Sequence, residues 1–207
     1  MDGLRETLEI LQKAGADLLH IDIMDGRFVE RMAFGADHVR MLKCMTALPL
    51  DVHLMVQEPE RHLDLMAAAG ADIITVHAES TTRLYSCLQK IRSRGLRAGV
   101  AISPGTSEQV LLPVLDVMDM ALFMTVNPGE GGQHYLPEVA DKIRRFRLLA
   151  GNRPPLIEVD GSIDAATIVP CVRAGANVFV SGGYLFQGDI TANLRTLRAA
   201  AEAAEFA

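Results

Sequence analysis

Four side chains in this sequence could together bind a metal ion: two imidazoles and two carboxylates near the ends of apolar, β-branched segments. They are His20, Asp22, His53 and Asp160. His20 and Asp22 are two positions apart in a strand-like segment, so their side chains point to the same face of it. Brought to one point, the four groups would suit one divalent transition metal, such as Zn²⁺, Fe²⁺, Mn²⁺ or Co²⁺.

Taken singly, these residues have ordinary explanations. A histidine in a strand is usually a hydrogen-bonded core residue, and an aspartate at a strand end is usually a cap or turn residue. The neighbouring positions of these segments, however, carry no Lys or Arg that could neutralise the two acids. Burying unpaired carboxylates together is costly. A bound cation would remove that cost, so the group as a whole predicts metal binding.

A second set of residues could bind an anion. The segment PGEGGQ (128–133) follows an apolar segment, and glycines also follow the next two apolar segments. A glycine-rich loop can turn several backbone N–H groups toward a phosphate, because glycine has no Cβ. Glycine after a strand is also common turn chemistry, but three consecutive loops of this kind fit the phosphate site of a barrel. The residues predicted to bind a phosphorylated substrate here are Gly129, Glu130, Gly131, Gly132, Gly161, Ser162, Gly182 and Gly183.

The elements that must position these residues alternate along the chain, which indicates repeated βα units around a parallel sheet. The predicted strands are 16–23, 50–55, 72–78, 97–103, 120–127, 155–161 and 177–183. The predicted helices are 3–14, 59–69, 80–94, 108–115, 137–150, 164–174 and 190–205.

Three of the helix-to-strand junctions are closely similar: KAGADLLHID, AAGADIITVH and RAGANVFVSG. Such repetition is typical of a repeated βα architecture. An open two-layer sheet is the competing arrangement. Polar residues recur at the C-terminal ends of nearly every strand, which favours a TIM (β/α)₈-type barrel, where the active site gathers at that end. Because residues 3–14 form a helix with no strand before them, we expect the barrel to lack its first β-strand.

Length and composition narrow the remaining possibilities. A chain of 207 residues with 49% hydrophobic content predicts one domain over 1–207. The net charge of −6 argues against nucleic acid as the partner. The three cysteines have no paired spacing, which favours a reducing, cytoplasmic setting without a disulfide framework. No apolar run approaches the roughly 18 residues of a membrane span, and the N-terminus does not resemble a signal sequence, so no membrane partner is expected.

The chain also resembles a known family. The phrases HIDIMDGRFVE, LDVHLMV, MTVNPGEGGQ, VDGSI and VFVSGGYLF are similar in order and spacing to those of ribulose-phosphate 3-epimerases, over residues 2–187. The resemblance implies interconversion of D-ribulose 5-phosphate and D-xylulose 5-phosphate by a 1,1-proton transfer at C3. One aspartate would remove the proton, the metal would stabilise the enediolate, and the other aspartate would return a proton to the opposite face.

The resemblance also implies roles for individual residues. Asp22 and Asp160 would be the acid/base pair as well as metal ligands. His20 and His53 would complete the metal shell, with His53 also close to the substrate. The apolar wall around the reacting carbons would consist of Met24, Met55 and Met124. Family members often form oligomers, so we expect a homo-oligomer.

Several positions depart from the family pattern. The usual first strand and its substrate-contacting Ser are absent. Glu30 and Arg31 replace a usual Pro-Asn, and Glu130 replaces a large apolar residue. Ser162 stands at a usual Gly, and Gly183 at a usual Ser. These differences leave the identity of the ketose phosphate open.

Three alternatives follow. The chain is also similar to D-allulose-6-phosphate 3-epimerases, which perform the same chemistry on a six-carbon substrate. It could be a truncated, non-catalytic paralogue that binds a sugar phosphate, since a missing strand leaves an exposed sheet edge. A phosphate-binding barrel of the tryptophan-biosynthesis type would share the glycine loops but not the His and Asp set. We also expect the native gene product to begin upstream of Met1 and to supply the missing strand.

Overall fold

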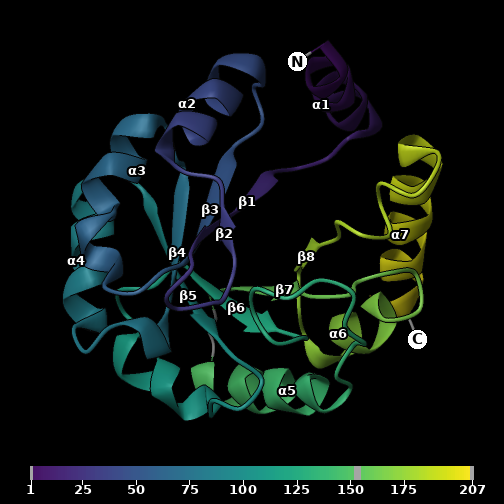
Figure 1. The fold of residues 1–207 in the computed structure, drawn as a ribbon. Helices are drawn as coiled ribbons and strands as arrows, with labels where there is room; N and C mark the ends of the chain where they lie inside the picture. The colour runs from purple at the N-terminus through teal and green to yellow at the C-terminus, as the bar shows by residue number, and fades with distance from the viewer. Residues whose placement is uncertain (1, 152–154, 206–207) are drawn as a thin grey trace.

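The structure is a computed structural model that describes residues 2–151 and 155–205, and it forms a curled sheet surrounded by helices (Figure 1). The strands are β1 (Leu19–Asp25), β2 (Met32–Ala33), β3 (Leu50–Met55), β4 (Ile73–His77), β5 (Arg97–Ile102), β6 (Met120–Met124), β7 (Leu156–Asp160) and β8 (Val178–Val180). The helices are α1 (Asp2–Ala14), α2 (Ala36–Met45), α3 (Leu63–Ala69), α4 (Leu84–Ser93), α5 (Glu138–Ala150), α6 (Ile168–Ala174) and α7 (Ile190–Glu205).

The sheet order is β2-β1-β3-β4-β5-β6-β7-β8. Every neighbouring pair is parallel except β1 and β2, which form a short antiparallel pair. All seven predicted strands are present, and the TIM-barrel prediction is confirmed. Within the described residues no ladder joins β8 to β1, and α1 and α7 lie on either side of that opening (Figure 1). The missing strand was expected upstream of Met1, and Met1 itself lies outside the described residues.

Each strand separates two environments because its side chains alternate between faces. On β1, Ile21 and Ile23 are buried in the main apolar core, which lies between the sheet and the surrounding helices. Two residues of the same strand, His20 and Asp22, point to the other face, into the centre of the barrel. A smaller apolar cluster fills the centre on the β5 and β6 side, and it includes Leu122 and Met124. The centre of the barrel is therefore polar on one side and apolar on the other.

Several helices are shorter than predicted. The segment 59–69 divides into a 3₁₀ turn, η1 (Pro59–Arg61), followed by α3. The predicted helix 80–94 is α-helical only over α4, and a 3₁₀ turn, η2 (Ala78–Ser80), ends where that helix was expected to begin. The segment 108–115 is a 3₁₀ helix, η3 (Glu108–Val114), rather than an α-helix. It contains Pro113, which has no N–H to donate to an α-helical hydrogen bond.

The segment 164–174 is helical only from Ile168. The Asp164 carboxylate accepts hydrogen bonds from the backbone N–H groups of Ala166 and Thr167, which holds a turn before the helix begins. The sequence-based list did not include α2 or the short strand β2.

In the described ranges no helix has both the length and the apolar composition needed to cross a membrane.

Candidate metal and active site

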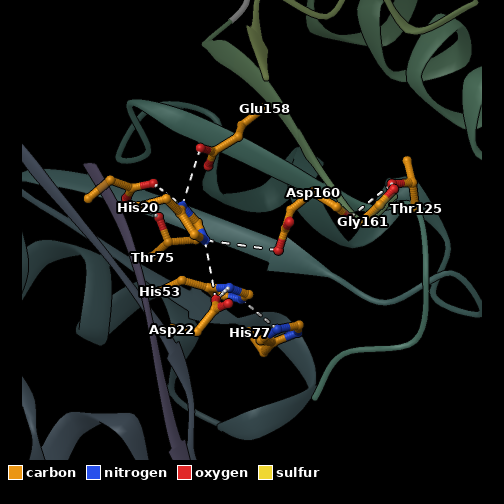
Figure 2. Close-up of polar contacts among 10 residues, drawn as sticks. His20, Asp22, His53, Thr75, His77, Thr125, Glu158, Asp160 and Gly161 are labelled. Atoms are coloured by element: carbon orange, nitrogen blue, oxygen red, sulfur yellow. Dashed lines mark hydrogen bonds and ion pairs between the residues drawn. The ribbon is translucent and has the colours of Figure 1, made fainter. Parts of the chain in front are cut away.

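The predicted ligand residues lie together inside the barrel, on three of its strands (Figure 2). β1 carries His20 and Asp22, β3 carries His53, and β7 carries Asp160. The parallel register of β1 and β3 sets Asp22 beside His53. Each of the four residues offers one ligand atom, and these atoms all lie within 4.8 Å of one another.

The distances identify which atoms face the common point. Asp22 Oδ1 is 3.0 Å from His53 Nδ1 and 3.3 Å from His20 Nε2. Asp160 Oδ2 is 4.0 Å from the same His20 nitrogen. The two histidines thus present different ring nitrogens, Nε2 for His20 and Nδ1 for His53. Such a set of two imidazole nitrogens and two carboxylate oxygens suits a divalent transition metal.

The hydrogen bonding of His20 supports that fit. Its Nδ1 is 2.7 Å from Asp51 Oδ2, and because a carboxylate only accepts, Nδ1 must donate its proton there. In the neutral ring Nε2 then carries a lone pair. This nitrogen is buried and has no hydrogen-bond partner among the described residues. A buried lone pair facing two carboxylates is a position where a cation would be stabilised.

The same carboxylates shift the pKa of His20. Burial alone would lower it, but the charge of Asp51, the hydrogen bond to Asp51 and the nearby carboxylates of Asp22 and Glu158 raise the pKa well above 6.5. In the metal-free protein a proton on His20 Nε2 can therefore occupy the position that a metal ion would otherwise take. Within the described residues no Lys or Arg forms an ion pair with these acids, so only the histidines balance their charge.

The two candidate catalytic aspartates have opposite pKa shifts. Burial would raise the pKa of Asp22, but the hydrogen bond with His53, the contact with His20 and the charges of both rings lower it well below its usual range. Burial also acts on Asp160, and there it prevails: with the charges of Asp22 and Asp51 it raises the pKa to about 6. Two acids whose pKa values are driven apart can divide the roles of proton acceptor and proton donor.

Further polar groups in the barrel were not included in the predicted site. Glu158 is fully buried on β7, and neither of its carboxylate oxygens has a hydrogen-bond partner in the described part of the chain. Burial and the charge of Asp51 raise the pKa of Glu158 to about 8. His77 on β4 is also fully buried, and its Nε2 lies 2.9 Å from His53 Nε2. The period-2 pattern of β4 places His77 on the barrel face, and that pattern was the available signal.

The predicted methionines lie at the same end of the barrel. Met24 pairs in register with Met55, and Met124 with Asp160. Met55 and Met124 are buried, whereas Met24 is half-buried. The three side chains therefore come from strand positions directly beside or beyond the ligand residues.

The three glycine-containing loops are linked to one another. The Thr125 hydroxyl, at the end of β6, donates to the carbonyl of Gly161. The Ser162 hydroxyl donates to the carbonyl of Gln133, and Ser181 donates to that of Ile163. Gly161 has φ +126°, and a Cβ there would lie 2.9 Å from a backbone nitrogen, so this position requires glycine. The loops after β6, β7 and β8 thus form one connected rim.

The other predicted phosphate residues differ in their surroundings: Gly129 lies against Val29, where an added Cβ would come within 2.4 Å of the Val29 Cβ. Gly182 and Gly183 are exposed, and a Cβ on either would meet no other atom within 4 Å. Glu130 is also exposed, and it lines a cavity of about 250 Å³ together with Glu30. This cavity lies between the loop after β1 and the loop after β6. Two departures from the family pattern, far apart in sequence, therefore share one cavity.

Comparisons with known proteins agree with this arrangement. A family model described as the ribulose-phosphate 3 epimerase family matches residues 1–186. The ribulose-phosphate 3-epimerase of Rhodobacter capsulatus is 40% identical over 204 residues, which cover 95% of this chain and 89% of that protein. The ribulose-phosphate 3-epimerase of Bacillus subtilis is 42% identical over 187 residues, 89% of this chain and 86% of the relative.

Solved structures with lower identity show the fold. A 3-keto-L-gulonate-6-phosphate decarboxylase from Vibrio cholerae superposes with a TM-score of 0.72 at 16% identity, covering 97% of this chain and 92% of that one. A 3-hexulose-6-phosphate synthase superposes with a TM-score of 0.69 at 19% identity, covering 95% and 94%. At these identities the likeness concerns the barrel alone.

Proposed function

The chain belongs to the ribulose-phosphate 3-epimerase family, and we propose that it is a metal-dependent isomerase that interconverts D-ribulose 5-phosphate and D-xylulose 5-phosphate. One observation carries the proposal beyond family membership: two imidazoles and two aspartates converge within 4.8 Å. The unpartnered nitrogen of His20 within this group gives a cation a reason to bind there. We propose that residues 1–207 act as a single domain.

Inverting C3 requires a proton carrier on each face of the substrate. Asp22, whose low pKa keeps it ionised, would accept the proton in one direction. Asp160, whose pKa is raised to about 6, would be the more readily protonated of the two aspartates and would deliver a proton to the opposite face. In the reverse reaction the two roles exchange.

The four ligand residues would hold one divalent transition metal, with Zn²⁺, Fe²⁺, Mn²⁺ and Co²⁺ as the candidates. Such an ion supplies positive charge that stabilises an oxyanion developing next to the reacting carbon. His20 and His53 would hold it without taking part in proton transfer. Met24, Met55 and Met124 would form an apolar wall that excludes water from the substrate carbons.

The substrate phosphate would bind at the rim formed by the loops after β6, β7 and β8. The loops contribute backbone N–H groups at Gly129, Gly131, Gly132, Gly161, Ser162, Gly182 and Gly183, as in other barrel phosphate sites. We also propose a homo-oligomer in the cytoplasm that binds neither nucleic acid nor membranes. The cysteines Cys44, Cys87 and Cys171 are all free, which supports a reducing compartment.

Hydrogen exchange in D₂O tests the two-aspartate mechanism. Asp22→Asn and Asp160→Asn should each lower epimerisation by about 10²-fold or more, because each removes one proton carrier. Each should also block exchange of the C3 proton in at least one direction. Asp37→Asn, at an exposed helix position, is the matched control and should keep full activity. Near-native rates in both site variants would show that the mechanism is wrong.

The identity of the substrate needs a direct comparison. Ribulose 5-phosphate, allulose 6-phosphate and tetrulose phosphates should be assayed side by side, and we expect the pentulose phosphate to give the highest kcat/KM. D-Allulose 6-phosphate is the second candidate, because Glu30 and Glu130 line the cavity beside the rim. A clear preference for a non-phosphorylated sugar would contradict the phosphate-site proposal.

A further inference from the structure

The side chain of Gln133 folds back onto the glycine-rich loop that it ends, residues 127–133. Its Oε1 accepts from the backbone N–H of Asn127 at 3.1 Å, and its Nε2 donates to the carbonyls of Asn127 at 2.7 Å and Glu130 at 2.9 Å. A backbone N–H only donates and a carbonyl only accepts, so these partners fix the orientation of the amide. One side chain therefore joins the beginning, the middle and the end of the loop.

The same loop is held at its tip and at its base. At the tip, Gly129 has φ +84°, and a Cβ there would lie 2.4 Å from the Val29 Cβ, so the backbone itself packs against the loop after β1. At the base, the Leu136 N–H donates to the Thr125 carbonyl at 2.9 Å. The Thr125 hydroxyl in turn donates to the Gly161 carbonyl, as Figure 2 shows. The loop therefore contacts the loops that follow β1 and β7.

Ser162 makes a further contact from the β7 side. Its hydroxyl donates to the backbone carbonyl of Gln133 at 2.6 Å. Its own carbonyl lies 2.9 Å from the hydroxyl of Thr167, the residue directly before α6. Ser162 is thus anchored to the turn before α6, and it reaches across to the residue whose side chain organises the loop.

The backbone of Ser162 shows that this contact has a cost. Its φ is +52°, in the left-handed region that glycine adopts easily and other residues adopt rarely. Members of the family usually have Gly at this position. A glycine would take the same conformation without strain, but it could not make the bond to Gln133. The serine therefore accepts a strained backbone and gains a link between two loops.

We propose that the Ser162 hydroxyl makes Ser162 a positioning residue, which holds the loop 127–133, through Gln133, in the shape that binds the substrate phosphate. The proposal rests on the phosphate site proposed above. A loop that is ordered before the substrate arrives does not have to be ordered during binding, so the substrate binds more tightly. The hydroxyl acts on KM and has no part in the proton transfers.

Two variants remove the hydroxyl and keep the backbone N–H of residue 162. Ser162→Gly also relieves the left-handed strain, whereas Ser162→Ala retains the Cβ and the strain. The amide of Asn127 reports on the loop, because the Gln133 side chain accepts its hydrogen bond. We expect its hydrogen-exchange rate, measured by NMR without substrate, to rise about 3- to 10-fold in both variants, which corresponds to one lost neutral hydrogen bond.

Kinetics and thermal melting separate positioning from a merely structural role. The KM for D-ribulose 5-phosphate should rise about 3- to 10-fold in both variants, while kcat changes by less than about twofold. Ser162→Ala should melt below Ser162→Gly because only alanine keeps the strain. A structural effect on KM would therefore be confined to Ser162→Ala. Ser93→Ala, which removes an exposed hydroxyl-to-carbonyl bond on α4, is the matched control and should change neither measurement.

A double variant tests whether Ser162 acts through Gln133. Gln133→Ala removes the side chain that joins the ends of the loop, and it should raise KM by itself. In that background Ser162→Gly should raise KM clearly less than it does in the wild-type background, because the hydroxyl then holds a residue that no longer organises the loop.

The proposal is overturned if Asn127 exchanges equally fast in wild type and in both Ser162 variants. It is also overturned if KM rises only in Ser162→Ala, or if the effects of Gln133→Ala and Ser162→Gly on KM are fully additive. A wild-type protein that turns over none of the sugar phosphates would instead contradict the proposed function. The exchange of Asn127 would still decide whether Ser162 holds the loop.

Discussion

At the scale of single residues, the barrel interior concentrates ionisable groups whose environments differ over a few ångströms. Glu158 and Asp160 are both on β7, but Glu158 is fully buried without a hydrogen-bond partner in the described structure, whereas Asp160 is half-buried and belongs to the candidate ligand set. Burial raises the pKa of both carboxyls. Each of these groups contributes to the pH dependence of the free energy of unfolding, and the direction of its pKa shift sets the sign of that contribution.

We expect the metal-free protein to lose thermal stability as the pH rises from 6.5 to 8. The pKa of Glu158 is raised to about 8, so the folded protein binds more protons than the unfolded chain up to that pH, and this contribution is lost as Glu158 ionises. His20, whose pKa is also raised, has the same sign. His53, whose pKa is lowered to about 4, acts in the opposite direction, but only below its ordinary value of 6.5.

Thermal unfolding in the presence of a chelator measures this effect. Glu158→Gln removes the titrating group from the same place and should flatten the dependence between pH 6.5 and 8. Glu9→Gln, on an exposed helix face, should leave it unchanged. A melting temperature that rises with pH in wild type over this window would contradict the assignment.

Metal content provides a second test at this scale. Wild-type protein purified without chelator should carry about one divalent transition metal per chain, and His53→Ala should lose it, because the variant removes one of four ligands. Elemental analysis by mass spectrometry gives the ratio. His38→Ala, at an exposed position, should retain the metal. Full occupancy in His53→Ala would show that the site is drawn incorrectly.

At the scale of the elements, the sequence was sufficient for the seven parallel strands, and it named the four residues that the structure brings together as a candidate ligand set. Strand positions followed from β-branched runs, and the period-2 rule put His20 and Asp22 on one face. The same rule places His77 on the barrel face of β4, but it could not show that His77 contacts the candidate ligand set, because one histidine in an apolar strand has no local feature that distinguishes it from a core residue. Helix starts were the least accurate part, since 3₁₀ turns and the Asp164 turn depend on hydrogen bonds that the pattern does not encode.

The contact between β4 and β5 gives a test of packing at this scale. Gly99 lies against Thr75, and a Cβ at Gly99 would come within 2.2 Å of the Thr75 hydroxyl and 3.2 Å of its Cα. Gly99→Ala should therefore destabilise the protein by about 1–3 kcal/mol or more. Chemical denaturation measures the change. Gly3→Ala, in α1 with no atom within 4 Å of the new Cβ, should be neutral or slightly stabilising.

At the scale of the whole molecule, the ring of helices continues across the side where the sheet is open. Arg198 on α7 donates to the backbone carbonyl of Gly15 and pairs with Asp17 at 2.7 Å, so the end of the chain is tied to the segment before β1. β1 carries two of the proposed ligands. The contact therefore holds β1 in place. In the described structure β1 has a parallel neighbour, β3, on one side only.

We expect Arg198→Ala to increase amide hydrogen exchange in β1 and β8, because it removes the hydrogen bonds that join α7 to the chain before β1. The loss of global stability should be only about 1 kcal/mol, since the pair is exposed. Exchange followed by mass spectrometry resolves the two strands. Arg144→Ala, which breaks an exposed pair within α5, should leave their exchange rates unchanged. Equal exchange in both variants would show that the tie has no such role.

Metal binding at the proposed site would also link the protein's lifetime to the supply of the ion. A ligand that binds only the folded state stabilises it by about 2.7 kcal/mol when its free concentration is 100 times its Kd. In a cell, stability differences of this size change how often a chain unfolds and meets a protease, and hence its abundance. Scarcity of the ion would then reduce both the number of enzyme molecules and the fraction of them that carries the metal. The supply of metal and the degradation of the protein would thus both limit the rate of the same reaction.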